Sequence, residues 1–473
     1  MSAPDDLDEL PRRSRTPFVV AAVLLAVAGS AAWFFLRTPP KKPEAPERTL
    51  FRSQLPAWSI ARSRSEGPAE LATCLETAKP WPAVAAAIEK LPDAWNDKDE
   101  MKAAVRAINE AARGAGLKYW VDPQFLRNGP IFTTYDVLGR AQWKGGPGSA
   151  TVEVLHVRRL DTVNIELGVL GHAGGDQPAV LRDRMELSVM RRLRTVDDED
   201  QRANDVDEEA TRLWKKTLAS LVPAAGLDEA QKRLDLRETL ARDMEKRLKG
   251  GKIHVARPER LVWGDDYFDF LEPYTSTRRR GGPLLLASDL RALRRADEAL
   301  DDSAGLTALV QVIELEATRV EAHEITHALD PAERDVPALL QSLVGENDVR
   351  FGHLAERELR AFIGELRDAK SPACLSVVSL GLQARGSGST ATAHFFAAHT
   401  LLATLAEVDG SRGLDVPTTV EVMQKLCALP DAELRARADK AATTLYGAPL
   451  SAQLSLSSRG GEGRGEEKPP ISN

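Results

Sequence analysis

The spacing of apolar and polar positions changes twice along the chain. From residue 56 to residue 116 the apolar side chains recur every three or four residues, as in Trp81–Leu91 and Lys102–Ala112, which predicts helices. Three runs rich in β-branched and aromatic residues follow, and they predict strands at Pro130–Val137, Thr151–Val157 and Val163–Leu170. The apolar run Arg184–Met190 predicts a further edge strand. We therefore expect a small antiparallel sheet flanked by helices.

Helical spacing returns in the second half of the chain. An acidic stretch, Asp197–Asp207, predicts a solvated loop, and the segments Glu208–Leu221 and Leu227–Leu248 after it predict helices. Most of the sequence beyond Leu284 follows the same pattern. The final stretch, Ser451–Asn473, is rich in Gly, Ser, Glu and Pro, a composition typical of disorder. The predicted fold class is α+β.

The longest apolar run lies near the N-terminus. Phe18–Leu36 has no charged residue, and as a helix it is about 28 Å long, close to the thickness of a bilayer's hydrocarbon core. It predicts a single-pass membrane anchor with the lipid bilayer as partner. A cleaved signal peptide is the alternative, since Ala28-Gly29-Ser30 offers small residues for cleavage. The apolar run continues through Leu36, which favours the anchor.

Membrane orientation depends on what flanks this span. Arg and Lys residues lie on both sides, so their count does not decide the orientation. The leader before the span is short, as in a signal anchor that exports the C-terminal part, and we expect the folded part on the extracytoplasmic side. There Cys374 and Cys427 could pair, with Cys74 left over; three unpaired buried thiols are the alternative.

These patterns divide the chain into successive segments. They are a short N-terminal tail (1–17), the anchor (18–36), a Pro-rich linker (37–50), a mixed α/β domain (51–260), a mainly helical domain (261–450) and a disordered tail (451–473). The mixed domain carries no catalytic motif. It could bind a partner, restrain an active site or present a substrate.

Composition narrows the classes of function. The 473 residues include 63 Lys and Arg against 70 Asp and Glu, a net charge of −7, which argues against nucleic-acid binding through bulk positive charge. The hydrophobic share of 43% is that of a globular protein. Three cysteines exclude a zinc site built from several thiolates. This argument does not exclude a zinc site made of His and Glu ligands.

One motif carries recognisable chemistry. His323-Glu324-Ile325-Thr326-His327 lies in a stretch, Leu306–Leu329, that has neither Pro nor Gly and predicts a helix. Histidines four residues apart project from one helix face, so both imidazoles can reach one Zn²⁺ ion. Glu324 points about 100° aside, where a general base can act on a metal-activated water. The plain alternative is a surface helix whose histidines pair with a glutamate.

A zinc site needs a third protein ligand, and a later helix offers one. In Phe351–Leu366 the helical angles put Glu358 inside the apolar arc, between Phe351 and Leu354. A carboxylate there is costly to bury unless it is paired or bound to a metal. We therefore predict Glu358 as the third ligand. The reserve candidates are Glu365, Glu356 and His353.

The sequence HEITHALD, followed about thirty residues later by ERELRAFIGEL, resembles zincin metallopeptidases of the gluzincin type. The resemblance covers residues 306–366. It implies a zinc-dependent enzyme that hydrolyses peptide bonds in a polypeptide substrate. In that arrangement His323, His327 and Glu358 would hold zinc, and Glu324 would be the catalytic base.

Further residues could support such a site. Asp330 and Glu316 share the histidine face of the helix, so either could orient a ligand imidazole. His394 could stabilise an oxyanion, although a lone histidine on an apolar helix is more often a core residue.

Two other classes of function stay open. A di-iron carboxylate protein is suggested by the Glu-x-x-His within the motif, but that fold needs a second such motif and the sequence offers none in a later helix. The other class is a non-catalytic, membrane-anchored envelope scaffold or partner-binding protein with a zincin-like helical domain. Measuring the zinc content of the purified protein would distinguish the scaffold hypothesis from the enzyme hypothesis.

Overall fold

The computed structural model describes most of the chain between residues 44 and 447. The described residues are 44–144, 151–161, 171–172, 177–194, 205–276 without 256 and 259, 284–329 without 302, 334–385 without 346 and 347, 392–447 and 459–460. The expected anchor at 18–36, the expected strand at 163–170 and Asp330 lie outside them. Within the described residues, no helix combines the length and apolarity needed to cross a bilayer.

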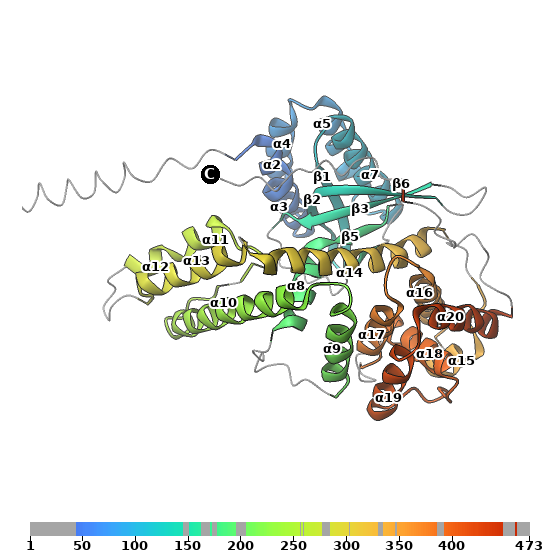
Figure 1. The fold of residues 1–473 in the computed structure, drawn as a ribbon. Coiled ribbons are helices and arrows are strands. Elements are labelled where there is room, and N and C mark those ends of the chain that lie inside the picture. The colour runs from blue at the N-terminus through green and yellow to red at the C-terminus, as the bar shows by residue number, and fades with distance from the viewer. Residues whose placement is uncertain are drawn as a thin grey trace, which may run out of the picture.

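The fold is a mixed α+β structure, which confirms the predicted class (Figure 1). The strands are β1 (Tyr119–Leu126), β2 (Gly129–Lys144), β3 (Thr151–Arg159), β4 (Gly171–His172), β5 (Ala179–Leu181) and β6 (Arg459–Gly460). They are ordered β1-β2-β3-β5-β4 across the sheet, with β6 paired to β2. The strands predicted at 130–137 and 151–157 lie inside β2 and β3, whereas β1 was not expected.

The sheet is mixed, so the expectation of an antiparallel sheet was wrong. β1, β2 and β3 pair in antiparallel fashion, but β3 and β5 run parallel. After β3 the chain forms β4 at the far edge of the sheet and then returns as β5, which lies between β3 and β4. β5 is antiparallel to β4 and parallel to β3. β4 therefore ends the described sheet on the side away from β1.

The predicted edge strand Arg184–Met190 is instead part of helix α8 (Arg182–Leu193). Its buried side chains include Met185, Val189 and Leu193, which are four residues apart and share one helix face. Over the shorter window the residues Met185, Leu187 and Val189 alternate as they would in a strand. The expected acidic loop also ends earlier than predicted, because helix α9 begins at Asp205.

An N-terminal group of helices covers the β1–β2 side of the sheet. Its members are α2 (Pro46–Thr49), the π-helical segment η1 (Leu50–Gln54), α3 (Leu55–Ser63), α4 (Pro68–Ala78), α5 (Pro82–Ile88), α6 (Leu91–Ala94) and α7 (Lys98–Gly114). Asp97 begins α7 by accepting hydrogen bonds from the backbone N–H groups of Asp99 and Glu100. Apolar side chains of these helices form one core with Val121 and Phe132 of the sheet.

Helix α14 (Ala304–Leu329) crosses beneath the sheet in Figure 1. The remaining helices are α9 (Asp205–Leu218), α10 (Ala224–Gly250), α11 (Asp265–Leu271), α12 (Pro273–Ser276), α13 (Ala287–Asp301), α15 (Ala338–Val344), α16 (Val349–Arg367), α17 (Ala373–Ala384), α18 (Ala393–Ala406), α19 (Val416–Cys427) and α20 (Asp431–Tyr446). Among them, α10, α13, α16 and α17 pack against α14. The largest core joins Trp143 and Val154 of the sheet to α14 and the C-terminal helices. Side chains from both expected domains thus share one core.

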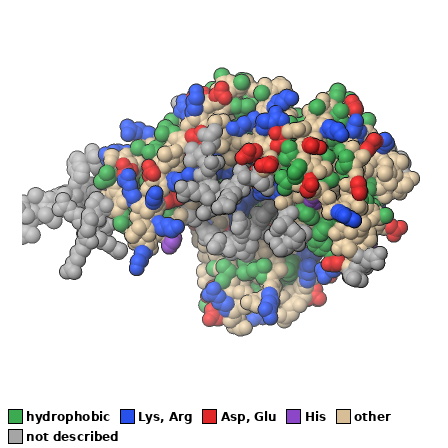
Figure 2. All heavy atoms as spheres, turned by 90° about the horizontal axis from the view of Figure 1, so that it is seen from below, with side chains coloured by type: hydrophobic (Ala, Val, Ile, Leu, Met, Phe, Trp, Pro, Cys, Tyr) green, Lys and Arg blue, Asp and Glu red, His purple; other side chains and the backbone are tan. Residues whose placement is uncertain are grey.

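Two further features complete the fold. Cys374 and Cys427 form a disulfide that ties α17 to α19, and Cys74 is a buried free thiol. On the face seen in Figure 2, Lys and Arg side chains are interspersed with Asp and Glu rather than gathered by sign. Although the net charge of the chain is −7, that face therefore shows no surface of a single charge sign that would favour one class of partner.

Candidate metal centre

Helix α14 presents both histidines of the His-Glu-x-x-His motif inside the protein. It contacts β3, β4 and β5 on one side and α16 on another, so most of its C-terminal half is buried. His323 is 7% exposed and Glu324 is 6% exposed. Polar groups that are buried this deeply need hydrogen-bond partners or ions. For His323 and His327, the structure supplies carboxylate partners from α16.

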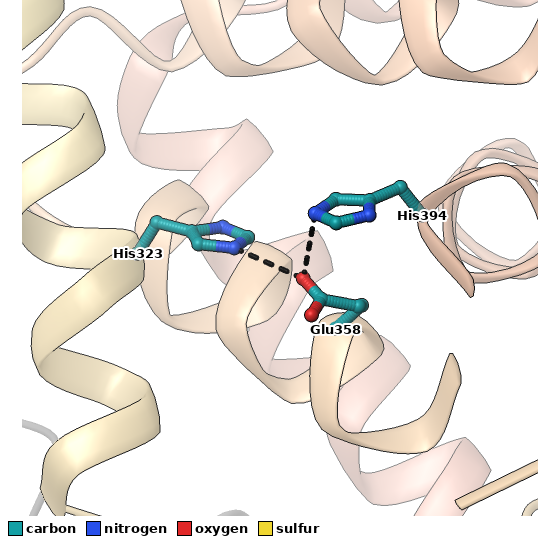
Figure 3. A group of neighbouring side chains, drawn as sticks. All are labelled: His323, Glu358 and His394. Atoms are coloured by element: carbon teal, nitrogen blue, oxygen red, sulfur yellow. Dashed lines mark hydrogen bonds and ion pairs between the residues drawn. The ribbon is translucent and has the colours of Figure 1, made fainter. Parts of the chain in front are cut away.

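Three imidazole rings surround one carboxylate oxygen. Oε2 of Glu358 lies 3.2 Å from Nε2 of His323, 3.4 Å from Nε2 of His327 and 3.1 Å from Nε2 of His394. Figure 3 shows His323 of α14 and His394 of α18 pointing toward Glu358 of α16. Among the described residues, these three form a group whose possible ligand atoms all lie within 4.8 Å of one another. The site therefore joins three helices that are far apart in sequence.

The cluster is held against an aromatic wall. Phe362 lies one turn after Glu358 on α16, and its ring packs edge-on against His323 at 4.9 Å. The same ring lies 6.1 Å from His394. One side of the cluster is therefore apolar, which strengthens the electrostatic interactions between its charged groups.

The contacts between His323 and Glu358 shift the pKa values of both side chains. Burial opposes protonation of His323, but its hydrogen bonds to Glu358 and Glu365, together with the charge of Glu324, outweigh burial and raise its pKa to about 10. Burial likewise opposes ionisation of Glu358, but its hydrogen bonds to His323, His327 and His394 hold its pKa well below the usual range. A charged carboxylate and an imidazolium thus stabilise each other.

The second ring nitrogen of His323 also has a carboxylate partner. Nδ1 lies 3.3 Å from Oε2 of Glu365, and the other oxygen of Glu365 accepts a hydrogen bond from Arg319 at 2.8 Å. Burial raises the pKa of Glu365, but Arg319 and then His323 outweigh it and lower the pKa. Glu365 therefore occupies the orienting position that we expected for Glu316 or Asp330. Glu365 lies seven residues after Glu358, about two helical turns on and on the same side of α16, and this spacing is the signal that could have revealed its role.

Glu316 serves a neighbouring network instead. Its carboxylate accepts hydrogen bonds from Trp214 at 2.7 Å, from Arg319 at 2.9 Å and from Arg192 at 3.2 Å. Through Arg319 it supports Glu365 rather than contacting a histidine itself. Glu316 is thus two contacts away from His323, through Arg319 and Glu365.

The remaining candidates lie apart from the cluster. Glu356 is fully buried and pairs with Arg360 at 2.7 Å. In the described part of the chain, neither Glu356 nor His353 belongs to the group of possible ligand atoms. His394, expected only as an accessory residue, does belong to it.

Glu324 lies beside the edge strand β4. A Cβ atom added to Gly171 of that strand would clash with the carboxylate of Glu324 and with Cγ1 of Val320. A larger residue here would therefore displace Glu324 or Val320, because the backbone of β4 passes close to the Glu324 side chain. This contact depends on how α14 packs against the sheet, and no local sequence pattern predicts it.

The side chains fit a zinc ion in type and in placement. Imidazole nitrogen and carboxylate oxygen are common zinc ligands, and here they converge on one point. The motif predicts His323, His327 and Glu358 as ligands, but among the described residues the group of converging ligand atoms contains His394 rather than His327. Because both histidines lie close to Glu358, at 3.4 Å for His327 and 3.1 Å for His394, either could be the third ligand. Glu365 supplies the outer hydrogen bond that ligand histidines usually make.

No protein-family model matches the chain, and no curated protein or solved structure is detectably similar to it. The functional proposal therefore depends on the arrangement of these side chains.

Proposed function

We propose that the protein is a membrane-anchored zinc peptidase, held by residues 18–36 with its folded part on the extracytoplasmic side. The observation that carries the proposal is the convergence of three imidazole nitrogens on Oε2 of Glu358, with Glu324 in the same turn of α14. A His₂Glu ligand set with a further glutamate in the same helical turn suits metal-assisted hydrolysis.

In this proposal each side chain has a separate task. Zinc, when bound, supplies a strong electrophile that lowers the pKa of water and polarises a carbonyl group. Glu324 accepts the proton of the attacking water and passes it to the leaving amide nitrogen. His394, whose side chain is 33% exposed, faces the open side and would donate a hydrogen bond to the oxygen on which negative charge develops.

The position of β4 supports a polypeptide as the substrate. β4 ends the described sheet, and its Gly171 lies against Glu324. An extended peptide that paired with this edge would have its backbone beside the base. Side chains that alternate across such a strand would then set the cleavage preference.

The proposal is tested on the full-length protein in detergent by measuring zinc content and the hydrolysis of a quenched fluorescent peptide library. We expect one zinc per chain, and we expect Glu324→Gln to keep the zinc while hydrolysis falls about 10²–10⁴-fold. Glu298→Gln, an exposed change on α13, is the matched control. Full zinc-dependent activity in Glu324→Gln would show that the mechanism is wrong.

A structural His–Glu cluster in a non-catalytic scaffold is the alternative, because Glu358, Glu365 and the histidines already stabilise one another's charges without a metal. That alternative predicts no bound zinc and no hydrolysis. A di-iron centre is not proposed, since the group in the described residues contains a single carboxylate where a bridged pair of ions needs several.

A further inference from the structure

A cleft of about 640 Å³ adjoins the metal centre without belonging to it. It lies between α7 and the strands β1, β2 and β3, and its lining continues to Gln177 and Ala328. Ala328 directly follows His327 on α14. Ala328 also lies four residues after Glu324, so these two residues share one face of α14. The lining extends from there to Lys98 at the start of α7. Its volume lies within the range of ligand-binding sites.

The cleft is richer in positive than in negative side chains, although the whole chain is acidic. Its cationic side chains are Lys98, Lys102, Arg106, Arg113 and Arg140, and its anionic ones are Glu110, Asp122 and Glu153. Lys98, Lys102 and Arg106 are each four residues apart on α7, so they share one helix face. A positive surface of this kind attracts negatively charged ligands.

One carboxylate holds two of the arginines in place. Glu153 accepts two hydrogen bonds from Arg113 at 3.1 Å and one from Arg140 at 2.7 Å. Gln177 donates a further hydrogen bond to Glu153 at 2.7 Å. Two positive charges are thus positioned by one negative charge, and this part of the cleft keeps a surplus of positive charge.

The other end combines charge with an exposed ring. The Lys98 ammonium lies 5.3 Å from the ring centre of Phe125, which is 36% exposed. The outer edge of β1 is covered at Val121, because the Asn109 side chain bonds both the N–H and the C=O of that residue. A ligand here would therefore be recognised by charge and by contact with the ring rather than by adding a strand to β1.

We propose that this cleft binds an acidic stretch of the polypeptide substrate and so positions the neighbouring peptide bond at the metal centre. This inference rests on the proposed peptidase function. An acidic, extended segment complements the cationic α7 face, and the continuity of the cleft with Ala328 links that segment to His327. Charge contacts of this exposed kind act mainly on association and weaken as salt is added.

The binding step is tested on full-length Glu324→Gln protein in detergent, with fluorescein-labelled octapeptides of Glu, Gln or Lys. At low salt we expect the Glu peptide to bind at least tenfold more tightly than the Gln peptide, and we expect the difference to shrink at high salt. Lys98→Glu/Lys102→Glu should remove this preference. Lys232→Glu/Lys246→Glu, which makes the same charge change at exposed sites of α10, is the matched control and should keep it.

The catalytic step is tested with the active protein and pairs of library peptides that differ only in an acidic block. The Lys98→Glu/Lys102→Glu variant should raise KM for the acidic peptides about tenfold, with kcat and zinc content unchanged. Equal binding of the Glu and Gln peptides, or loss of the preference in the α10 control as well, would overturn the cleft proposal even if hydrolysis is found. Cleft-dependent binding without any hydrolysis would instead contradict the peptidase function, and with it the role of the cleft in positioning a substrate.

Discussion

Nδ1 of His323 lies 3.3 Å from Oε2 of Glu365, a carboxylate that is 1% exposed. Arg319 holds the other oxygen of Glu365, and Glu316 in turn holds Arg319. The ring of His323 is thus fixed from behind by buried charges, while its Nε2 faces Glu358. In a zinc site, such a chain sets which ring nitrogen is free to bind the metal.

Replacing Glu365 by Gln should weaken zinc binding without removing a ligand. The amide can still hydrogen-bond Nδ1, but it loses the negative charge that makes the imidazole a better donor, so we expect zinc affinity to fall about 10- to 100-fold. Competition with a fluorescent chelator measures this. An unchanged zinc affinity, in a variant that remains folded, would mean that Glu365 is part of the core and does not position His323.

Zinc binding should release a proton near neutral pH. The metal-free cluster holds His323 as an imidazolium because its pKa is raised to about 10, and an imidazole must be neutral to bind a metal. The stabilisation from this raised pKa is fully present below about 6.5 and is lost as pH rises through about 10 in the metal-free protein. Zinc affinity should therefore increase about tenfold per pH unit across the neutral range.

Calorimetry in buffers of different ionisation enthalpy counts this proton. We expect about one proton per zinc from His323 at pH 7. His254→Asn, a change at an exposed histidine on another part of the surface, serves as the control and should leave the count unchanged. Zinc uptake with no proton release would contradict the charged state of His323.

Adding a methyl group at Gly171 should impair catalysis more than metal binding. In Gly171→Ala the new Cβ would meet the carboxylate of Glu324, which must then move away from its position beside the metal site. We expect kcat to fall by about 10²-fold, as misplacement of a catalytic group usually costs, while zinc content stays at one per chain. Gly139→Ala in β2 is the matched control, because its Cβ would meet no atom within 4 Å. A normal kcat in Gly171→Ala would show that β4 does not position Glu324 for catalysis.

Residues within one helix were predictable from sequence, because helical angles depend only on local geometry. The angles put Glu358 in an apolar arc, and the structure places its carboxylate beside both histidines with the side chain 17% exposed. The arc itself was less accurate, because Leu354 is exposed and Glu356, outside the arc, is fully buried. His394 could be named only as an accessory residue, because nothing in the sequence shows that α18 packs against α16. That Glu365 rather than Glu316 contacts His323 likewise depends on how α14 and α16 pack together.

The errors in the predicted fold arose because the prediction judged short stretches of sequence. Met185, Leu187 and Val189 alternate like a strand, and only the longer spacing to Leu193 shows the helix. The parallel pairing of β3 and β5 depends on where the chain returns after β4, which no local pattern encodes. Tertiary packing therefore decided the features that sequence spacing left open.

The buried carboxylate of Glu316 should stabilise the fold in a pH-dependent way. Burial raises its pKa, but Arg319 and then Arg192 outweigh burial, with Trp214 adding a hydrogen bond, and the net shift lowers the pKa from 4.5. A lowered pKa in the folded state gives a stabilisation that is present above about 4.5 and is lost as pH falls through the folded value. Glu316→Gln leaves two arginines without this charge, so we expect it to reduce the free energy of unfolding by about 3 kcal/mol at pH 7.

Urea unfolding at several pH values measures the effect, with Glu298→Gln as the exposed control. The difference between wild type and Glu316→Gln should narrow as the pH drops below 4.5, and a difference that stays constant would show that the carboxylate's charge is not what stabilises this part of α14.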